Sequence, residues 1–386
     1  MKWFNSRKYR SLSDTVVFAQ RFESQYEKQI LNARTKREEK VKSFLATADK
    51  EAKKNFLVAF SRLNKMVAHY ATVSERLLLF FDNNVLQDIR YRDDAEQPLR
   101  GHRFYGLLAF LALIEDHYCL DVFACVSPVV LYEASGRGKH APKHVVEQVR
   151  LLLAEVGLAT HFSGHSTPKE LGEIFKLIQH DENALRIALD EIKDKSWARD
   201  FVAMNGRGTR IPFSMAEDEC PKIKLAYFEP WYVKFLLMHV IEKNMYRENS
   251  EKKKVRQMML NPQKKAFSVI KMKGDGVEGL GDIELLTLCD LSYQTLARSP
   301  NITVGITFDD RLENALWDRA NVQSRTTFIA GGDDASDGAL RFVYLMQQSE
   351  RRTDKANKRA IEYFEIKVKF LELLEKYFKM DSEETV

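Results

Sequence analysis

The chain has 386 residues, of which 45% are hydrophobic and 30% charged, values that are ordinary for a globular protein long enough to bury a sizeable core. No apolar stretch approaches the roughly 20 residues of a membrane span and no apolar signal core follows the N-terminus, so we expect a cytoplasmic protein without a membrane segment. The four cysteines form no CxxC pair, which argues against a disulfide framework or a structural zinc site.

A basic helical region is expected at the N-terminus, over residues 1–76. It carries seventeen lysines and arginines against eight acidic residues, although the net charge of the whole chain is only +5. Residues 13–75 contain neither Gly nor Pro, and apolar residues between 56 and 70 recur at helical spacing. The basic surplus fits solvated helix faces as well as it fits contact with phosphate groups.

Two apolar runs predict the first strands of a parallel sheet, within a core segment 77–141. Residues 77–86 run into Asp82-Asn83-Asn84-Val85-Leu86, and residues 121–132 run into Glu133. Such runs of β-branched, aromatic and aliphatic residues are typical of strands buried on both faces. A helix over 100–118 would return the chain between them, and the helix after Glu133 is interrupted by glycines.

Residues 142–275 are predicted to form a mostly helical insertion, with helices over 143–156, 168–179, 181–200 and 230–247. An aromatic cluster at 227–232 could stack nucleic-acid bases, but a packed core patch is the commoner outcome for such a cluster.

A strongly basic block lies near the end of this insertion. Residues 242–273 hold ten lysines and arginines against three acidic residues, and such blocks attract phosphate backbones without reading sequence. The residues expected to contact nucleic acid are Lys252, Lys253, Lys254, Arg256, Lys264 and Lys265.

The core is expected to resume over 276–330. Gly281-Asp282-Ile283-Glu284 reads as a helix start, and the apolar run from 302 ends in Thr307-Phe308-Asp309-Asp310. The remaining segment, 331–386, is predicted to be a charged helical C-terminal region.

Four acids follow or adjoin these predicted strands: Asp82, Glu133, Asp282 and Asp309. Open α/β sheets bind ligands at the carboxyl ends of their strands, and converging carboxylates repel one another unless a cation such as Mg²⁺ or Mn²⁺ neutralises them. Asp82 and Asp282 also have an ordinary structural interpretation as helix caps, and Glu133 as a first-turn acid.

Four further residues are expected to support this site. Asn84 would hold Asp82 by hydrogen bonds, and Thr307 would do the same for Asp309. Glu284 is a secondary ligand candidate, and Asp310 competes with Asp309 for one role.

In this order the segments resemble the PIN-domain family of metal-dependent nucleases. Asp82-Asn83-Asn84-Val85-Leu86 resembles its opening Asp-Thr-Asn-(Val/Leu)-Leu, with Asn83 in the Thr position. Glu133 matches its second acid, Asp282 matches the acid of its Gly-Asp-x-Glu helix start, and Thr307-Phe308-Asp309 matches its last motif. The resemblance covers about 77–135 and 278–318, and the long gap between Glu133 and Asp282 departs from the minimal family pattern.

This resemblance implies an α/β fold with a PIN-like parallel sheet flanked by helices, a large helical insertion and helical extensions at both ends. It also implies a Mg²⁺- or Mn²⁺-dependent endonuclease that uses the four acids as catalytic metal ligands, with RNA favoured over DNA. The alternatives are an inactive PIN-like module that binds nucleic acid or protein, and a purely helical scaffold. The helical regions are candidates for contact with a protein partner or a second copy of the chain.

Overall fold

The structure, a computed structural model, describes residues 26–71, 76–195, 220–241, 270–289, 302–316 and 353–378, except for 231–232, 235, 239, 275, 311 and 314–315. The basic residues from Lys252 to Lys265 expected to contact nucleic acid lie outside these ranges, as does most of the segment 331–386 apart from its helix over 353–378.

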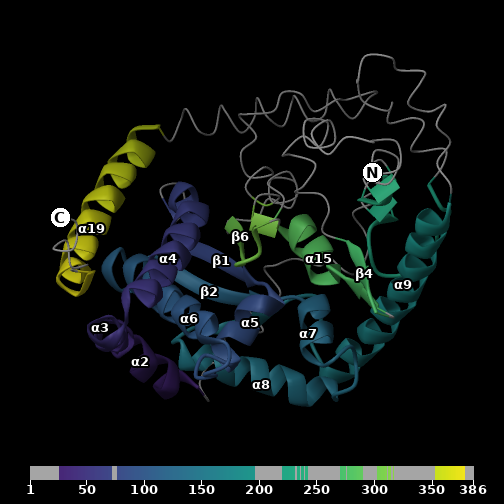
Figure 1. Cartoon of the computed structure of the whole chain (residues 1–386), viewed down its shortest axis with the longest axis horizontal. Helices are drawn as coiled ribbons and strands as arrows, with labels where there is room; N and C mark the ends of the chain where they lie inside the picture. The colour runs from purple at the N-terminus through teal and green to yellow at the C-terminus, as the bar shows by residue number, and fades with distance from the viewer. Residues whose placement is uncertain are drawn as a thin grey trace.

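A four-stranded parallel sheet forms the centre of the molecule (Figure 1). Its order is β3 (Thr160–Phe162), β2 (Asp121–Val126), β1 (Arg76–Phe81) and β6 (Ile302–Ile306). β1 pairs with β2 on one side and with β6 on the other, so two segments far apart in sequence become neighbours. The five residues of β1 after Arg76 are all buried, as expected for a central strand covered on both faces. The α/β fold class is therefore correct, and the purely helical alternative is wrong.

Helices cover the sheet on both sides and extend to its two ends. The elements of the first half are α2 (Glu27–Thr35), α3 (Arg37–Thr47), α4 (Lys50–Ala71), α5 (Asn83–Arg90), α6 (Pro98–Leu111) with the π-helical turn η4 (Ala112–His117), α7 (Pro128–Ala134), α8 (Pro142–Glu155) and α9 (Pro168–Asp194). The second half adds the hairpin β4 (Lys271–Lys273) and β5 (Gly276–Glu278), then α15 (Leu280–Leu288) and α19 (Thr353–Phe378). α9 and α19 lie at opposite ends of the molecule (Figure 1).

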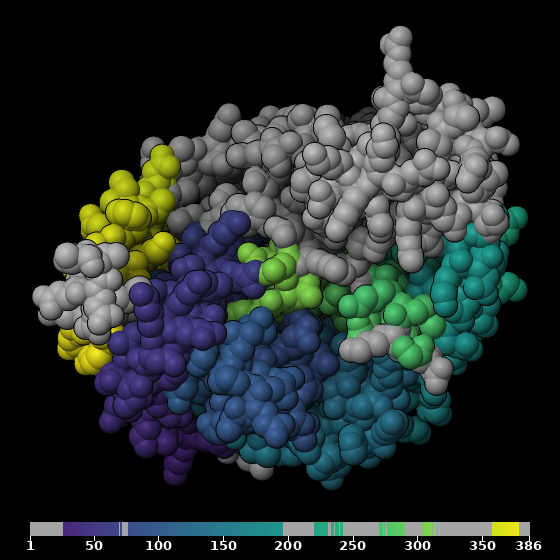
Figure 2. All heavy atoms as spheres, viewed as in Figure 1, coloured from purple at the N-terminus to yellow at the C-terminus, as the bar shows by residue number. Residues whose placement is uncertain are grey.

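One continuous hydrophobic core joins the N-terminal helices to the sheet. Phe56, Phe60, Leu63 and Val67 lie on one face of α4 at helical spacing and are buried in this core together with the strands. Within the segment 1–76, the described helices therefore contribute to the same core as the sheet. In the space-filling view the green atoms of the second half pack between the blue and purple first half and the teal α9 (Figure 2).

Two predicted strands were too long. β1 ends at Phe81 and β2 at Val126, and helices α5 and α7 occupy the residues that follow. Pro128 at the first position of α7, with the Ser127 hydroxyl accepting from Val130 N, starts a helix where the apolar run Val129–Leu131 suggested a strand. Short apolar runs do not distinguish a buried strand from a buried helix.

The predicted boundary of the insertion at residue 142 is also displaced. β3 pairs in parallel with β2, so the sheet continues to Phe162. The two helices expected over 168–179 and 181–200 form one continuous helix, α9, in the part that is described. None of the described helices is long and apolar enough to cross a membrane.

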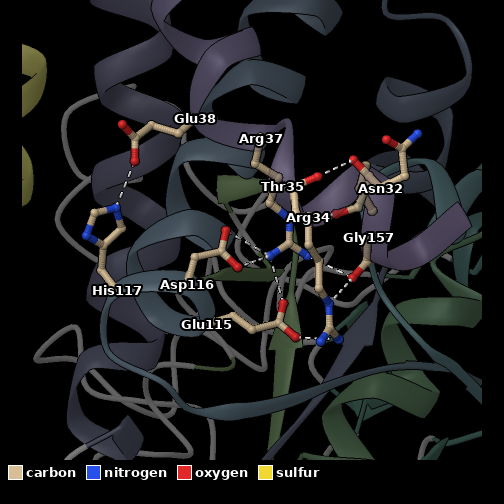
Figure 3. Close-up of polar contacts among 10 residues, drawn as sticks. Asn32, Arg34, Thr35, Arg37, Glu38, Glu115, Asp116, His117 and Gly157 are labelled. Carbon is tan, nitrogen blue, oxygen red and sulfur yellow. Dashed lines mark hydrogen bonds and ion pairs between the residues drawn. The ribbon is translucent and has the colours of Figure 1, made fainter. Parts of the chain in front are cut away.

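A buried arginine ties the N-terminal helices to the core (Figure 3). Arg37 is fully buried and donates to Glu115 Oε2 at 2.8 Å, to Val156 O at 2.8 Å and to Gly157 O at 2.9 Å. Arg34, one turn earlier in the sequence, donates to the same Gly157 carbonyl and pairs with Glu115. These contacts join α2 and α3 to η4 and to the turn after α8.

Candidate functional site

Asp82 lies directly after β1, at the carboxyl edge of the sheet, and is almost completely buried. Its backbone N–H donates to Ile306 O at 3.0 Å, which continues the β1–β6 ladder by one residue. Its Oδ2 atom accepts hydrogen bonds from Thr307 Oγ1 at 2.8 Å and from Asn84 Nδ2 at 3.1 Å. The carboxylate is thus fixed from two neighbouring segments.

Thr307 also fixes Asp309, the acid that follows β6. Its hydroxyl oxygen accepts from Asp309 N at 3.0 Å while its proton is donated to Asp82. Asp82 and Asp309 are therefore connected through a single hydroxyl. Asp309 Oδ1 accepts from Leu312 N at 3.0 Å, so this acid also caps the helical turn after β6.

The other two acids come from α7 and α15. In each of these two helices a glutamate accepts a hydrogen bond from the first turn of the other helix. Glu133, in the second turn of α7, accepts from Gly281 N at 3.1 Å in the first turn of α15. Glu284 of α15 accepts in return from Val129 N at 3.0 Å, in the first turn of α7. Carboxylates stabilise helix N-termini, where backbone N–H groups lack intrahelical partners. These two hydrogen bonds hold Asp282, the residue after Gly281, at the same edge of the sheet as Asp82.

The four acids interact electrostatically. Burial raises the pKa of Asp82 and outweighs the hydrogen bond from Thr307, while the nearby charge of Asp309 raises it further. Burial raises the pKa of Glu133 to about 7, with a contribution from the charge of Asp82. Burial also raises the pKa of Asp282 well above its ordinary value. The charges of Asp82, Glu133 and Asp309 all act on Asp282 in the same direction.

These residues fit a hard cation by their chemistry. All four donors are carboxylates, and the raised pKa values of Asp82, Glu133 and Asp282 express a deficit of positive charge that a divalent ion would remove. Within the described ranges, no three acidic, histidine or cysteine side chains already stand in a geometry that could hold an ion. Binding would therefore require rotation of these carboxylate side chains.

Two supporting candidates have other partners. Glu284 accepts from Val129 N and from the Tyr227 hydroxyl, so it connects α15 to α7 and to the segment that carries Tyr227. Asp310 is exposed and pairs with Arg62, whereas Asp309 bonds to Thr307. In the predicted aromatic cluster, Tyr227 and Phe228 are buried, as expected for a packed core patch.

Two carboxylates of α9 that the sequence analysis did not single out bind segments that adjoin the four acids. Asp181 is completely buried and accepts from the backbone N–H groups of residues 226–228 at 2.7–2.8 Å. Glu182 accepts from Tyr132 Oη at 2.9 Å and from Val277 N at 3.3 Å. Adjacent acids in a long amphipathic helix are normally exposed, so the sequence contained no signal for these contacts.

Neither a protein-family model, nor a curated protein sequence, nor a solved structure matches this chain. The function of the site is therefore inferred from its own residues and from the resemblance noted in the sequence.

Proposed function

We propose that the chain is a Mg²⁺- or Mn²⁺-dependent nuclease of the PIN-like type, an endoribonuclease by preference, acting through Asp82, Glu133, Asp282 and Asp309. The observation that supports this proposal is the mutual electrostatic coupling of four carboxylates from four separate segments at the carboxyl edge of a parallel sheet. The preference for RNA comes from the family resemblance alone.

A bound Mg²⁺ or Mn²⁺ ion would orient the scissile phosphate, lower the pKa of a water molecule and offset the charge that develops on the phosphate. Asp82, Asp282 and Asp309 would be its main ligands, with Glu133 binding the ion or a water molecule. Thr307 and Asn84 act as positioning residues because both donate to Asp82 Oδ2 and restrict the orientation of that carboxylate.

The deciding experiment is a cleavage assay with the purified full-length protein on labelled single-stranded RNA and DNA. We expect cleavage with Mg²⁺ or Mn²⁺ and none with a chelator. Asp82→Asn removes one ligand charge at nearly constant volume, so we expect cleavage to fall by at least about 100-fold. The variant should fold, because it relieves repulsion from Asp309 and retains an oxygen that can accept from Thr307.

Asp310→Asn is the matched control, since this neighbouring acid pairs with Arg62 and should be dispensable for cleavage. Metal binding is measured separately, as the rise in melting temperature on adding Mn²⁺, because an ion that binds only the native state stabilises it. Cleavage that survives chelation, or an Asp82→Asn variant with wild-type activity, would overturn the proposal. Binding of RNA without metal-dependent cleavage would favour the inactive binding module instead.

A further inference from the structure

The β4–β5 hairpin lies immediately before α15 and has two different faces. In its antiparallel register Lys271 opposes Glu278, Met272 opposes Val277 and Lys273 opposes Gly276. Directly opposed residues share a face, and successive residues alternate between faces. Val277 is fully buried and Met272 packs against the core, so positions 271, 276 and 278 lie on the outer face.

Arg137 adds a guanidinium group to this outer face. Its Nη2 donates to Val277 O at 3.1 Å, and its Nη1 binds Glu182. A Cβ atom built at Gly276 would lie only 1.9 Å from Arg137 Nη1, so the guanidinium occupies the space where a side chain at 276 would project. Arg137 itself has a φ of 64° between two glycines that also have positive φ, a conformation found in few non-glycine residues.

Both cations adjoin the segments that carry the acids. β5 ends at Glu278, two residues before α15 begins at Leu280, and Arg137 follows α7, the helix that carries Glu133. The Lys271 side chain is 56% exposed and pairs with Glu278 Oε2 at 2.9 Å. An exposed ion pair contributes little to stability, so a phosphate can replace the glutamate at little cost.

We propose that the outer face of the β4–β5 hairpin binds the phosphate backbone of a nucleic acid at the entrance to the carboxylate cluster, with Lys271 as its principal contact. This inference rests on the proposed nuclease function, because it assumes that the ligand is a phosphodiester chain. A cluster of carboxylates repels such a chain, and cations on the adjoining hairpin counteract that repulsion. The ammonium group of a lysine has three N–H donors, which bind phosphate oxygens without regard to base sequence.

The test measures binding of the full-length protein to a fluorescent 20-nucleotide single-stranded RNA by anisotropy, in chelator and at several NaCl concentrations. We expect Lys271→Gln to raise Kd several-fold and to reduce the slope of log K against log salt by about 0.7, the loss of one phosphate contact on a single strand. Lys271→Arg, which keeps the charge, should retain most of the affinity.

Lys176→Gln is the matched control. Lys176 is also exposed and pairs with a glutamate, Glu173, at 3.0 Å, but it belongs to α9 and not to the hairpin. We expect this variant to bind as the wild type does. Equal affinity and salt slope for Lys271→Gln and the wild type, or a wild type that binds no RNA, would overturn the inference.

Binding is measured without cleavage, so this result is separate from that of the catalytic test. A weakened Lys271→Gln variant together with an inactive wild-type protein would support the binding face and refute the nuclease. Arg137 is left unchanged because its bonds to Glu182 and Val277 hold the hairpin in place.

Discussion

Asp88 is a buried acid of α5 that takes no part in the proposed chemistry. Its nearest cation is Arg103, whose Nη1 lies 3.6 Å from Asp88 Oδ2, beyond hydrogen-bond distance. Among the described residues no donor forms a hydrogen bond with that oxygen. Burial raises the pKa of Asp88 to about 6, although Arg103 and Arg100 both lower it.

This raised pKa predicts a pH-dependent loss of stability. The native state holds the Asp88 proton up to about pH 6, whereas the unfolded chain releases it near pH 4, so this residue lowers the free energy of unfolding as pH rises between these values. Asp88→Asn removes that loss. We expect the difference in unfolding free energy between variant and wild type to become more favourable to the variant by about 1 kcal/mol from pH 5 to pH 7.5.

Urea denaturation at both pH values measures this difference. Asp190→Asn on α9 is the control, since its carboxylate is exposed beside Arg186 and its variant should show the same difference at both pH values. A pH-independent effect of Asp88→Asn would contradict the prediction.

The sequence identified the acids at the sheet edge but could not assign the roles of their neighbours. Asp82 and Asp309 were predictable because each follows a strand, and parallel strands align their carboxyl ends. The roles of Glu284 and Asp310 were not predictable, because their partners Val129 and Arg62 belong to helices far away in the sequence.

The packing of α6 against α4 depends on a glycine. Gly106 of α6 lies against α4, and a Cβ atom added there would come within 2.7 Å of Ala59 Cβ and 3.0 Å of Phe56 O. Both are rigid neighbours, because one is the Cβ of a helix residue and the other is backbone. Space between α4 and α6 therefore permits only a hydrogen atom at residue 106.

Gly106→Ala should destabilise the protein by about 1–3 kcal/mol, the usual cost of overpacking a core, despite the better helix propensity of alanine. Gly172→Ala on α9 is the matched control: its nearest contact would be Pro142 Cγ at 3.6 Å, an ordinary van der Waals distance. There we expect no loss, or a gain of up to about 1 kcal/mol. Thermal and urea denaturation measure both variants, and equal effects would refute the packing argument.

The elements differed from expectation mainly where a strand passes into a helix. Apolar residues continue from β2 into α7 because both are buried, so periodicity gave no boundary there. The residue at that boundary is Pro128, and proline is favoured at the first position of a helix. β3 has only three residues, and strands of that length carry no detectable alternation.

The hydrogen bonds of Arg37 link the N-terminal helices α2 and α3 to η4 and to the turn after α8. Arg37→Met removes the positive charge that compensates buried Glu115, whose pKa is already raised by burial. We expect a loss of about 3–5 kcal/mol in the free energy of unfolding, typical of a broken buried pair. Adding Glu115→Gln to this variant should recover part of the loss.

Arg186→Met is the control for this prediction, because Arg186 forms an exposed pair with Asp190 at 3.8 Å. Such pairs contribute at most about 1 kcal/mol. If urea denaturation gave the same small loss for Arg37→Met and Arg186→Met, the network would not be the attachment that its geometry indicates.

The position of β6 in the sheet sets an order of events during synthesis. β1, β2 and β3 emerge from the ribosome within one continuous stretch, but β6 follows roughly 140 residues later, about 7–28 s at 5–20 residues per second. Until then β1 is an open edge that needs protection from pairing with other chains. Asp82 and Glu133 are also synthesised before Asp282 and Asp309, so a nascent chain that lacks the last two cannot assemble the acidic cluster. An RNA-cutting enzyme built in this order would be unable to attack the message that encodes it until the segment that carries Asp282 and Asp309 had been synthesised.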